Sequence, residues 1–185
     1  MAVSALTQRP SRVDPRVTRT RKLIRDALVS LLAEKNFESI TVQDIAGHAT
    51  VNRATFYAHF SDKFALLDAM IREDLAGHLS EGDPLATTQT RELLLAVGKN
   101  TFAFVELHRR CRIDRDFEPQ MQRSMEAELT DFLMPRFSHC TAMLIASALV
   151  GAAMSWRHQS PNAPFEPIVA NIVEILVDGV DNPKA

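Results

Sequence analysis

Polar side chains that suit contact with nucleic acid lie close together between residues 41 and 63. If residues 53–60 form a helix, Phe56 and Phe60 are four residues apart and share one face, so the residues beside them point outward. Arginine can bond guanine O6 and N7 together and threonine can contact base edges, whereas tyrosine, histidine and lysine suit phosphate oxygens. The residues that we expect to contact DNA are Thr41, Asn52, Arg53, Thr55, Tyr57, His59 and Lys63. Among them, Arg53 and Thr55 are the candidates for base edges.

The segment predicts two short helices joined by a tight turn. Thr41 is a suitable N-cap, and Asp44, three residues later, stands where the acid of a capping box stands. Asn52 is a suitable N-cap for the second helix. The apolar spacing of three and four residues gives the first helix, over residues 42–48, a buried face of Val42, Ile45, Ala46 and Ala49. Such a helix pair is how a small domain reads the major groove.

Two longer helices should support this pair. The first, from about residue 15 to 35, has a buried stripe of Ile24, Ala27, Leu28, Leu31 and Leu32. The other is expected to start at Asp62 with Ser61 as its cap, and to end near Leu79, where SEGDP (80–84) is a breaker. Lys63 would lie in its first turn, beside the positive end of the helix dipole, which suits a phosphate. The residues expected to face inward on this helix are Phe64, Leu67, Ile71 and Leu75.

The segment resembles the amino-terminal domain of the TetR family of bacterial transcriptional regulators. The resemblance rests on DIA (44–46), RATFYAHF (53–60) and the following DK, preceded by TRKLIRDALVSLLAEKNFESI, and it covers roughly residues 17–75. It implies phosphate contacts at Thr41, Tyr57, His59 and Lys63. It also implies a carboxy-terminal body that dimerises and binds a small effector, whose binding releases the protein from a roughly palindromic operator.

Two residues depart from the family pattern. Asn36 stands where glycine is usual after the first helix, and asparagine tolerates the left-handed conformation expected at a helix end. Thr50 stands where glycine is common in the turn, and a β-branched residue is disfavoured at positive φ. The turn must therefore use another conformation or accept a modest strain.

The rest of the chain is also expected to be helical. Further helices are predicted over residues 93–108, 120–133, 139–158 and 165–180. We therefore expect an all-α protein, with a three-helix helix-turn-helix head and a helical-bundle body for ligand binding and dimerisation. Its parts are a basic flexible arm (1–15), the DNA-binding domain with its linking helix (16–79) and the body (80–185).

The last two predicted helices suit a homodimer. Residues 139–158 are apolar almost all round, so this helix should be buried on two sides, and small side chains let helices approach closely. Those small residues are Ala142, Ala146, Ala148, Gly151, Ala152 and Ala153. A monomer core is the alternative.

Candidates for the lining of an effector pocket are Phe102, Phe104, Met121, Met125, Phe132, Met143 and Trp156, each of which could equally be plain core.

Charge and composition fit a DNA-binding protein of the cytoplasm. The formal net charge is -2, but residues 1–63 hold 10 Lys and Arg against 6 Asp and Glu, whereas residues 64–185 hold 11 against 17. Two cysteines make no disulfide framework, no secretory signal is present, and no apolar run approaches the ~20 residues of a membrane span. A basic arm leading into the first helix consists of Arg9, Arg12, Arg16, Arg19, Arg21, Lys22 and Arg25.

Three other functions compete with this interpretation. His108 and Cys111 with His139 and Cys140 would make a metal or redox site if two helix ends met, although their spacing matches no standard zinc signature. A TetR-like protein that has lost DNA binding is a second alternative. An enzyme is the third, but no nucleophile–base pair or glycine-rich phosphate loop stands out. We therefore expect no catalytic residue, no bound metal and no cofactor.

Overall fold

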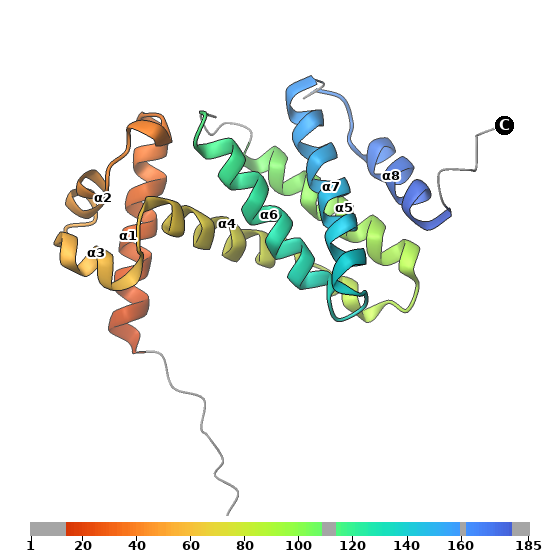
Figure 1. Cartoon of the computed structure of the whole chain (residues 1–185), viewed down its shortest axis with the longest axis horizontal. Coiled ribbons are helices and arrows are strands. Elements are labelled where there is room, and N and C mark those ends of the chain that lie inside the picture. The colour runs from red at the N-terminus through yellow and green to blue at the C-terminus, as the bar shows by residue number, and fades with distance from the viewer. Residues whose placement is uncertain (1–13, 109–113, 160–161, 179–185) are drawn as a thin grey trace, which may run out of the picture.

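The computed structural model describes residues 14–108, 114–159 and 162–178 (Figure 1). Within these ranges it contains eight α-helices, two short 3₁₀ turns (Phe37–Ser39 and Pro84–Ala86) and no strand, so the expected all-α class is confirmed. The helices are α1 (Pro15–Glu34), α2 (Val42–His48), α3 (Arg53–His59), α4 (Lys63–Leu79), α5 (Thr90–Leu107), α6 (Phe117–Leu133), α7 (His139–Gln159) and α8 (Glu166–Asp178).

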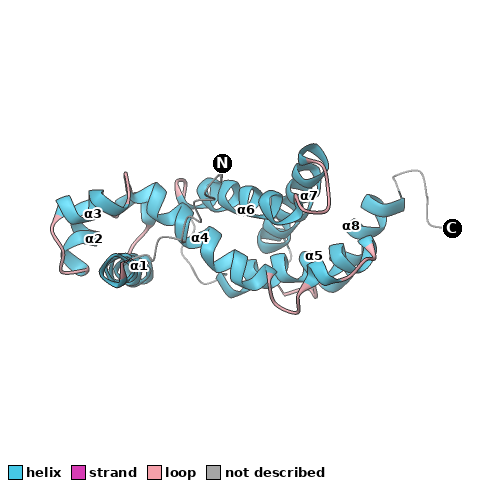
Figure 2. Cartoon of the chain, turned by 90° about the horizontal axis from the view of Figure 1, so that it is seen from below, coloured by secondary structure: helices cyan, strands magenta, loops and turns pink. Residues whose placement is uncertain are grey.

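Helices α1, α2 and α3 form a head at one end of the molecule, and α4 leads from it into a bundle of α5 to α8 (Figures 1 and 2). The head is held by apolar side chains from each of its elements: Ile24 and Leu28 on α1, Ile45 on α2, and Phe56 on α3 are all fully buried. Phe37, in the 3₁₀ turn between α1 and α2, is also fully buried and contacts the edge of Phe64.

Three local details differ from the sequence-based expectations. Asp62, not Ser61, is the N-cap of α4, because its carboxylate accepts from the Ala65 amide at 2.8 Å. Phe64 is not buried with the rest of α4 but is 36% exposed. The end of α1 needs no left-handed residue: Asn36 has φ -65° and ψ 145°, so the chain simply leaves the helix in extended conformation.

The body is a bundle in which α6 lies between α4 and α7, while α5 packs against α7 and α8. Gly98 on α5 allows the close approach of α8, since a Cβ at this position would lie 2.6 Å from Val169 Cγ1. The predicted helix over 165–180 is found as α8, and its last two expected residues lie outside the described residues.

Helix α7 is long and apolar enough to cross a membrane by length and composition, contrary to the expectation that no segment approaches this. Its inner face packs on α5 and α6, as in a core helix, with Ala142, Ala146 and Ala153 fully buried. Its other face is open: Met143 and Leu144 are 51% and 63% exposed. One side of α7 is therefore buried within the described chain, and the other is available to a partner.

Candidate nucleic-acid interface

The start of α2 is fixed by a complete capping box. The Thr41 hydroxyl accepts from the Asp44 amide at 3.1 Å, and the Asp44 carboxylate accepts from the Thr41 amide at 2.9 Å. Lys35 adds a 2.9 Å ion pair to the same carboxylate. These backbone and side-chain donors, Thr41 and Lys35, lower the pKa of Asp44 to about 2. The expected phosphate contact of Thr41 would have to be made while its hydroxyl also serves this cap.

The turn between α2 and α3 uses the left-handed conformation. Thr50 has φ 55°, so of the two alternatives open from the sequence, this turn accepts the strain. The bend is closed by backbone bonds typical of a left-handed helix end: the Val51 amide donates to the Ala46 carbonyl at 2.9 Å, and the Thr50 amide to Gly47 at 3.1 Å. The turn thereby aims α3 away from α2.

Helix α3 presents a basic and aromatic outer face. Phe56 is fully buried and Phe60 is 5% exposed, so they pin the helix as expected, while Tyr57 is 48% exposed. The Arg53 Nη2 atom lies 3.4 Å from the Tyr57 hydroxyl, because the two residues are one turn apart on the exposed side.

Asn52 and Thr55, two of the residues expected to contact DNA, bond to each other in the N-terminal cap of α3. The Asn52 Oδ1 atom accepts from the Thr55 amide at 2.7 Å and from the Thr55 hydroxyl at 3.0 Å. Asn52 is exposed, whereas Thr55 and His59 are half-buried. The Thr55 hydroxyl donates its only hydrogen to Asn52, so only its lone pairs and the methyl group stay available for a base edge, and Thr55 is a weaker candidate than Arg53.

Lys63 is engaged inside the head rather than extended from it. Its Nζ atom donates to the Phe37 carbonyl at 2.8 Å and to the Glu38 carbonyl at 3.0 Å, and lies 4.5 Å from the centre of the Phe37 ring. An ammonium group has three donors, so one remains for a phosphate. Lys63 therefore ties the turn after α1 to the start of α4, a role that the sequence did not indicate.

Part of the predicted basic arm belongs to α1 and pairs with α4. Arg25 contacts Glu73 and lies 2.6 Å from an Asp74 oxygen, and Arg21 lies 3.5 Å from Glu73 with its guanidinium 4.6 Å from the centre of the Phe60 ring. These two arginines therefore link α1 to α4, and that they also contact DNA stays a prediction. Arg9 and Arg12, and most of the expected arm over residues 1–15, lie outside the described residues.

Helix α4 is also tied to the body. Its Asp68 carboxylate accepts from the Ser124 hydroxyl at 2.6 Å, and Arg72 pairs with Glu128 of α6 at 3.0 Å. Partial burial lowers the pKa of Arg72, but the hydrogen bonds and charges of Asp131 and Glu128 outweigh this effect, so the pKa is raised. Because α4 forms ion pairs or hydrogen bonds with both α1 and α6, a change in its position would alter contacts in the head and in the body.

Two further exposed polar side chains on α2 were not among the predicted DNA contacts. Gln43 and His48 are exposed on α2, close in sequence to Thr41 and to the turn. Both side chains can donate to phosphate oxygens. The signal that could have found them is their position on the face of the helix opposite Ile45 and Ala46.

The predicted pocket residues belong to the body of the protein. Most lie in the core of the body, where Phe102 and Trp156 have ring centres 5.8 Å apart and Phe165 lies 5.6 Å from each. Met143 is half exposed on the outer face of α7. The remaining members, Phe104, Met121 and Met125, are buried, and Phe132 is half-buried. That this set forms an effector pocket stays a prediction.

The histidines of the suggested metal site lie at opposite ends of α6. His108 shares a cavity wall with Phe117, the first residue of α6, whereas His139 begins α7 beyond the other end of α6. A helix of this length separates them by roughly 25 Å. Cys111 lies outside the described residues, and Cys140 is exposed. The described members of this cluster therefore do not converge on one ion.

Comparison with known proteins assigns the head. The family model described as bacterial regulatory proteins, tetR family, matches residues 24–70, which include α2 and α3. The chain is 38% identical over 76 residues to YxbF and 43% identical over 53 residues to YdeS, two uncharacterized HTH-type transcriptional regulators of Bacillus subtilis (strain 168). Residues 24–70 therefore form an amino-terminal domain of the TetR type. The alignments cover 40% and 29% of the chain, and only 20% and 27% of these relatives.

Solved structures of TetR-family regulators share the fold of both domains. A regulator from Streptomyces coelicolor A3 aligns with a TM-score of 0.61 at 19% identity, over 90% of this chain and 97% of its own. The FadR regulator of Bacillus subtilis, solved in complex with stearoyl-CoA, aligns with a TM-score of 0.53 at 18% identity, over 86% and 98%. The helical body that follows the head thus has the same fold as the bodies of these structures.

Proposed function

We propose that the protein is a ligand-responsive transcriptional repressor that binds a roughly palindromic operator as a homodimer and is released by a small-molecule effector. The observation that carries the proposal is the outer face of α3, where Arg53 and Tyr57 stand side by side on a helix pinned by Phe56. We infer that Arg53 and Thr55 contact base edges, and that Tyr57, His59 and Lys63 contact phosphates, with Thr41 and Asn52 at the helix starts.

The open side of the body supports a homodimer. The outer face of α7 and the neighbouring α8 expose large apolar side chains, with Leu144 at 63%, Ile175 at 44% and Val177 at 39%. Two copies joined through these helices would make a four-helix interface around a two-fold axis. The two heads would then meet half-sites about 34–36 Å apart, or a multiple of that distance.

The class of protein also suggests the chemistry of the effector and the compartment in which the protein works. FadR of Bacillus subtilis and FadR of Thermus thermophilus were solved in complex with stearoyl-CoA and lauroyl-CoA, which are ligands with a long apolar part. We infer that an effector with an apolar part acts here as well, by shifting the population of head positions away from the one that fits the operator. A regulator that binds chromosomal DNA works in the cytoplasm.

The test is a binding titration on double-stranded DNA selected from a random library, repeated at several salt concentrations. Arg53→Ala should weaken binding to the selected site by about 5- to 150-fold and relax its sequence preference. Arg53→Lys keeps the charge but cannot form the bidentate hydrogen bonds of a guanidinium group. The variant should therefore lose sequence preference while its binding keeps the same salt dependence. Tyr57→Phe should weaken all sequences alike.

Lys99→Ala is the matched control, since Lys99 is an exposed cation on α5 of the body. It should leave the affinity unchanged, and sedimentation of the complex should give two protein chains per site. If the library yields no preferred DNA, or if Lys99→Ala and Arg53→Ala weaken binding equally, the head does not read an operator. A TetR-like interaction protein would then be the better description.

A further inference from the structure

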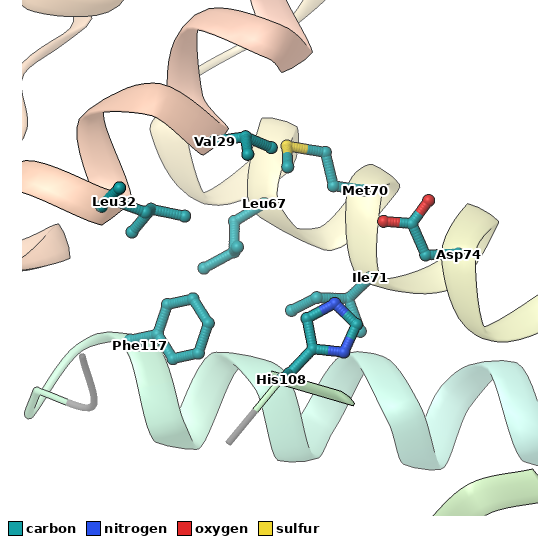
Figure 3. Close-up of a pocket in the computed structure, with 9 residues that line it drawn as sticks. Val29, Leu32, Leu67, Met70, Ile71, Asp74, His108 and Phe117 are labelled. Atoms are coloured by element: carbon teal, nitrogen blue, oxygen red, sulfur yellow. The ribbon is translucent and has the colours of Figure 1, made fainter. Parts of the chain in front are cut away.

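A cavity of about 290 Å³ lies where the head meets the body, between α1, α4, the end of α5 and the start of α6 (Figure 3). Its walls are almost entirely apolar: Met70 of α4 and Phe117 of α6 are buried, and Val29 and Ala33 of α1 stand exposed beside its opening. None of the residues predicted to line an effector pocket in the body reaches it. The cavity is therefore a separate feature, shared by both domains.

The polar groups on its wall are hydrogen-bond acceptors. The Nδ1 atom of His108 lies 2.8 Å from the Phe104 carbonyl, which can only accept, so Nδ1 carries a proton, and in the tautomer that this bond selects Nε2 is an acceptor. Asp74 is held from one side by Arg25 at 2.6 Å and has no donor of its own when ionised. A ligand that satisfies either group must bring a donor.

The volume limits the size of the ligand. An apolar cavity of about 150 Å³ holds benzene, so a cavity about twice as large holds a molecule of two rings or a chain of similar bulk. We propose that this junction cavity is a binding site for a small, largely apolar molecule that carries one hydrogen-bond donor.

A molecule in this cavity would touch both domains at once. Beside it, the Glu38 amide of the head donates to Asp114 at 3.0 Å, and the Phe37 and Phe117 rings meet edge to face at 6.2 Å. A ligand that fits one position of the head better than another shifts the population toward it. Where the protein binds an operator, as proposed above, the operator and this ligand must change each other's affinity by the same factor.

The test uses 2-naphthol, a fluorescent molecule of two fused rings with one O–H donor, titrated into the full-length protein. The double variant Val29→Phe/Ala33→Phe should weaken the probe at least about fivefold, because the added rings take the space of the ligand. Both positions are exposed on α1, so the fold should survive. Leu23→Phe, on the same helix but away from the cavity, should bind as the wild type does. The matched control 2-methylnaphthalene, in which a methyl group replaces the hydroxyl donor, should bind about two- to tenfold more weakly than 2-naphthol.

Equal probe binding by the wild type and the double variant would overturn the site, and equal affinity with and without the donor would overturn the ligand class. Repeating the titration with saturating operator DNA tests the coupling. If DNA binds but the probe affinity does not change, the regulatory role is wrong although the site stands. If no DNA binds, the proposed function fails while the probe titration still decides the site.

Discussion

Replacing Thr50 by glycine should stabilise the protein, although the substitution removes a side chain. Thr50 has φ 55°, a conformation that costs an L-residue with a Cβ about 1–2 kcal/mol. Glycine removes that cost but adds about 0.5–1 kcal/mol of unfolded-state entropy. The Thr50 side chain is exposed, and the backbone bond from Val51 to Ala46 does not involve it. The net gain in the free energy of unfolding should therefore be about 0.5–1 kcal/mol.

Urea denaturation followed by circular dichroism measures this change, and the midpoint of thermal unfolding should rise by about 1–4 °C. Two substitutions isolate the cause. Thr50→Ala keeps a Cβ at positive φ, so it should give little or no gain. Ala54→Gly, in the exposed first turn of α3, should instead lose about 1 kcal/mol. If Thr50→Ala stabilised as much as Thr50→Gly, the β-branch and not the left-handed backbone would be the source of the strain.

Two further predictions concern packing and pH. Gly98→Ala should lower the free energy of unfolding by on the order of 1 kcal/mol, since its Cβ would lie 2.6 Å from Val169, and Val169→Ala should cost less in that background than alone. Asp44, whose pKa is lowered to about 2 from 3.8, should stabilise the fold fully above pH 3.8 and lose this contribution as the pH falls toward 2. Asp44→Asn should flatten the acid limb of a stability-against-pH curve, and an unchanged limb would contradict the role of this carboxylate.

Local sequence signals predicted the head well because caps and apolar spacing act over a few residues. Thr41 with Asp44 and Asn52 with Thr55 set the starts of α2 and α3, and these bounds were predicted to within a residue. The buried pair of Phe56 and Phe60 followed from their spacing alone. The prediction failed at the end of α1, because a helix can also terminate in extended conformation, as Asn36 does.

Long-range partners could not be predicted from the sequence. Lys63 bonds carbonyl groups 25 and 26 residues earlier in the chain, and nothing in the sequence indicated these contacts. The carboxylate partners of Arg25 lie 48 and 49 residues away. Charge and helix position alone do not distinguish a solvent-facing cation from one that meets an acid on another helix. The junction cavity was missed for the same reason, since its walls come from four separate helices.

The geometry of α4 constrains how an effector could move the head. Arg72 faces α6, whereas the next two residues, Glu73 and Asp74, face the arginines of α1, so a rotation of α4 about its axis cannot preserve both sets of pairs. The α1 pairs are solvent-accessible, with Glu73 49% exposed, and are worth about 0–1 kcal/mol each. The coupling free energy between two binding sites on one protein is typically about 1–3 kcal/mol, which is similar to the contribution of these pairs taken together. An effector could therefore reposition the head by loosening the pairs between α1 and α4, while α4 keeps its more extensive contact with α6.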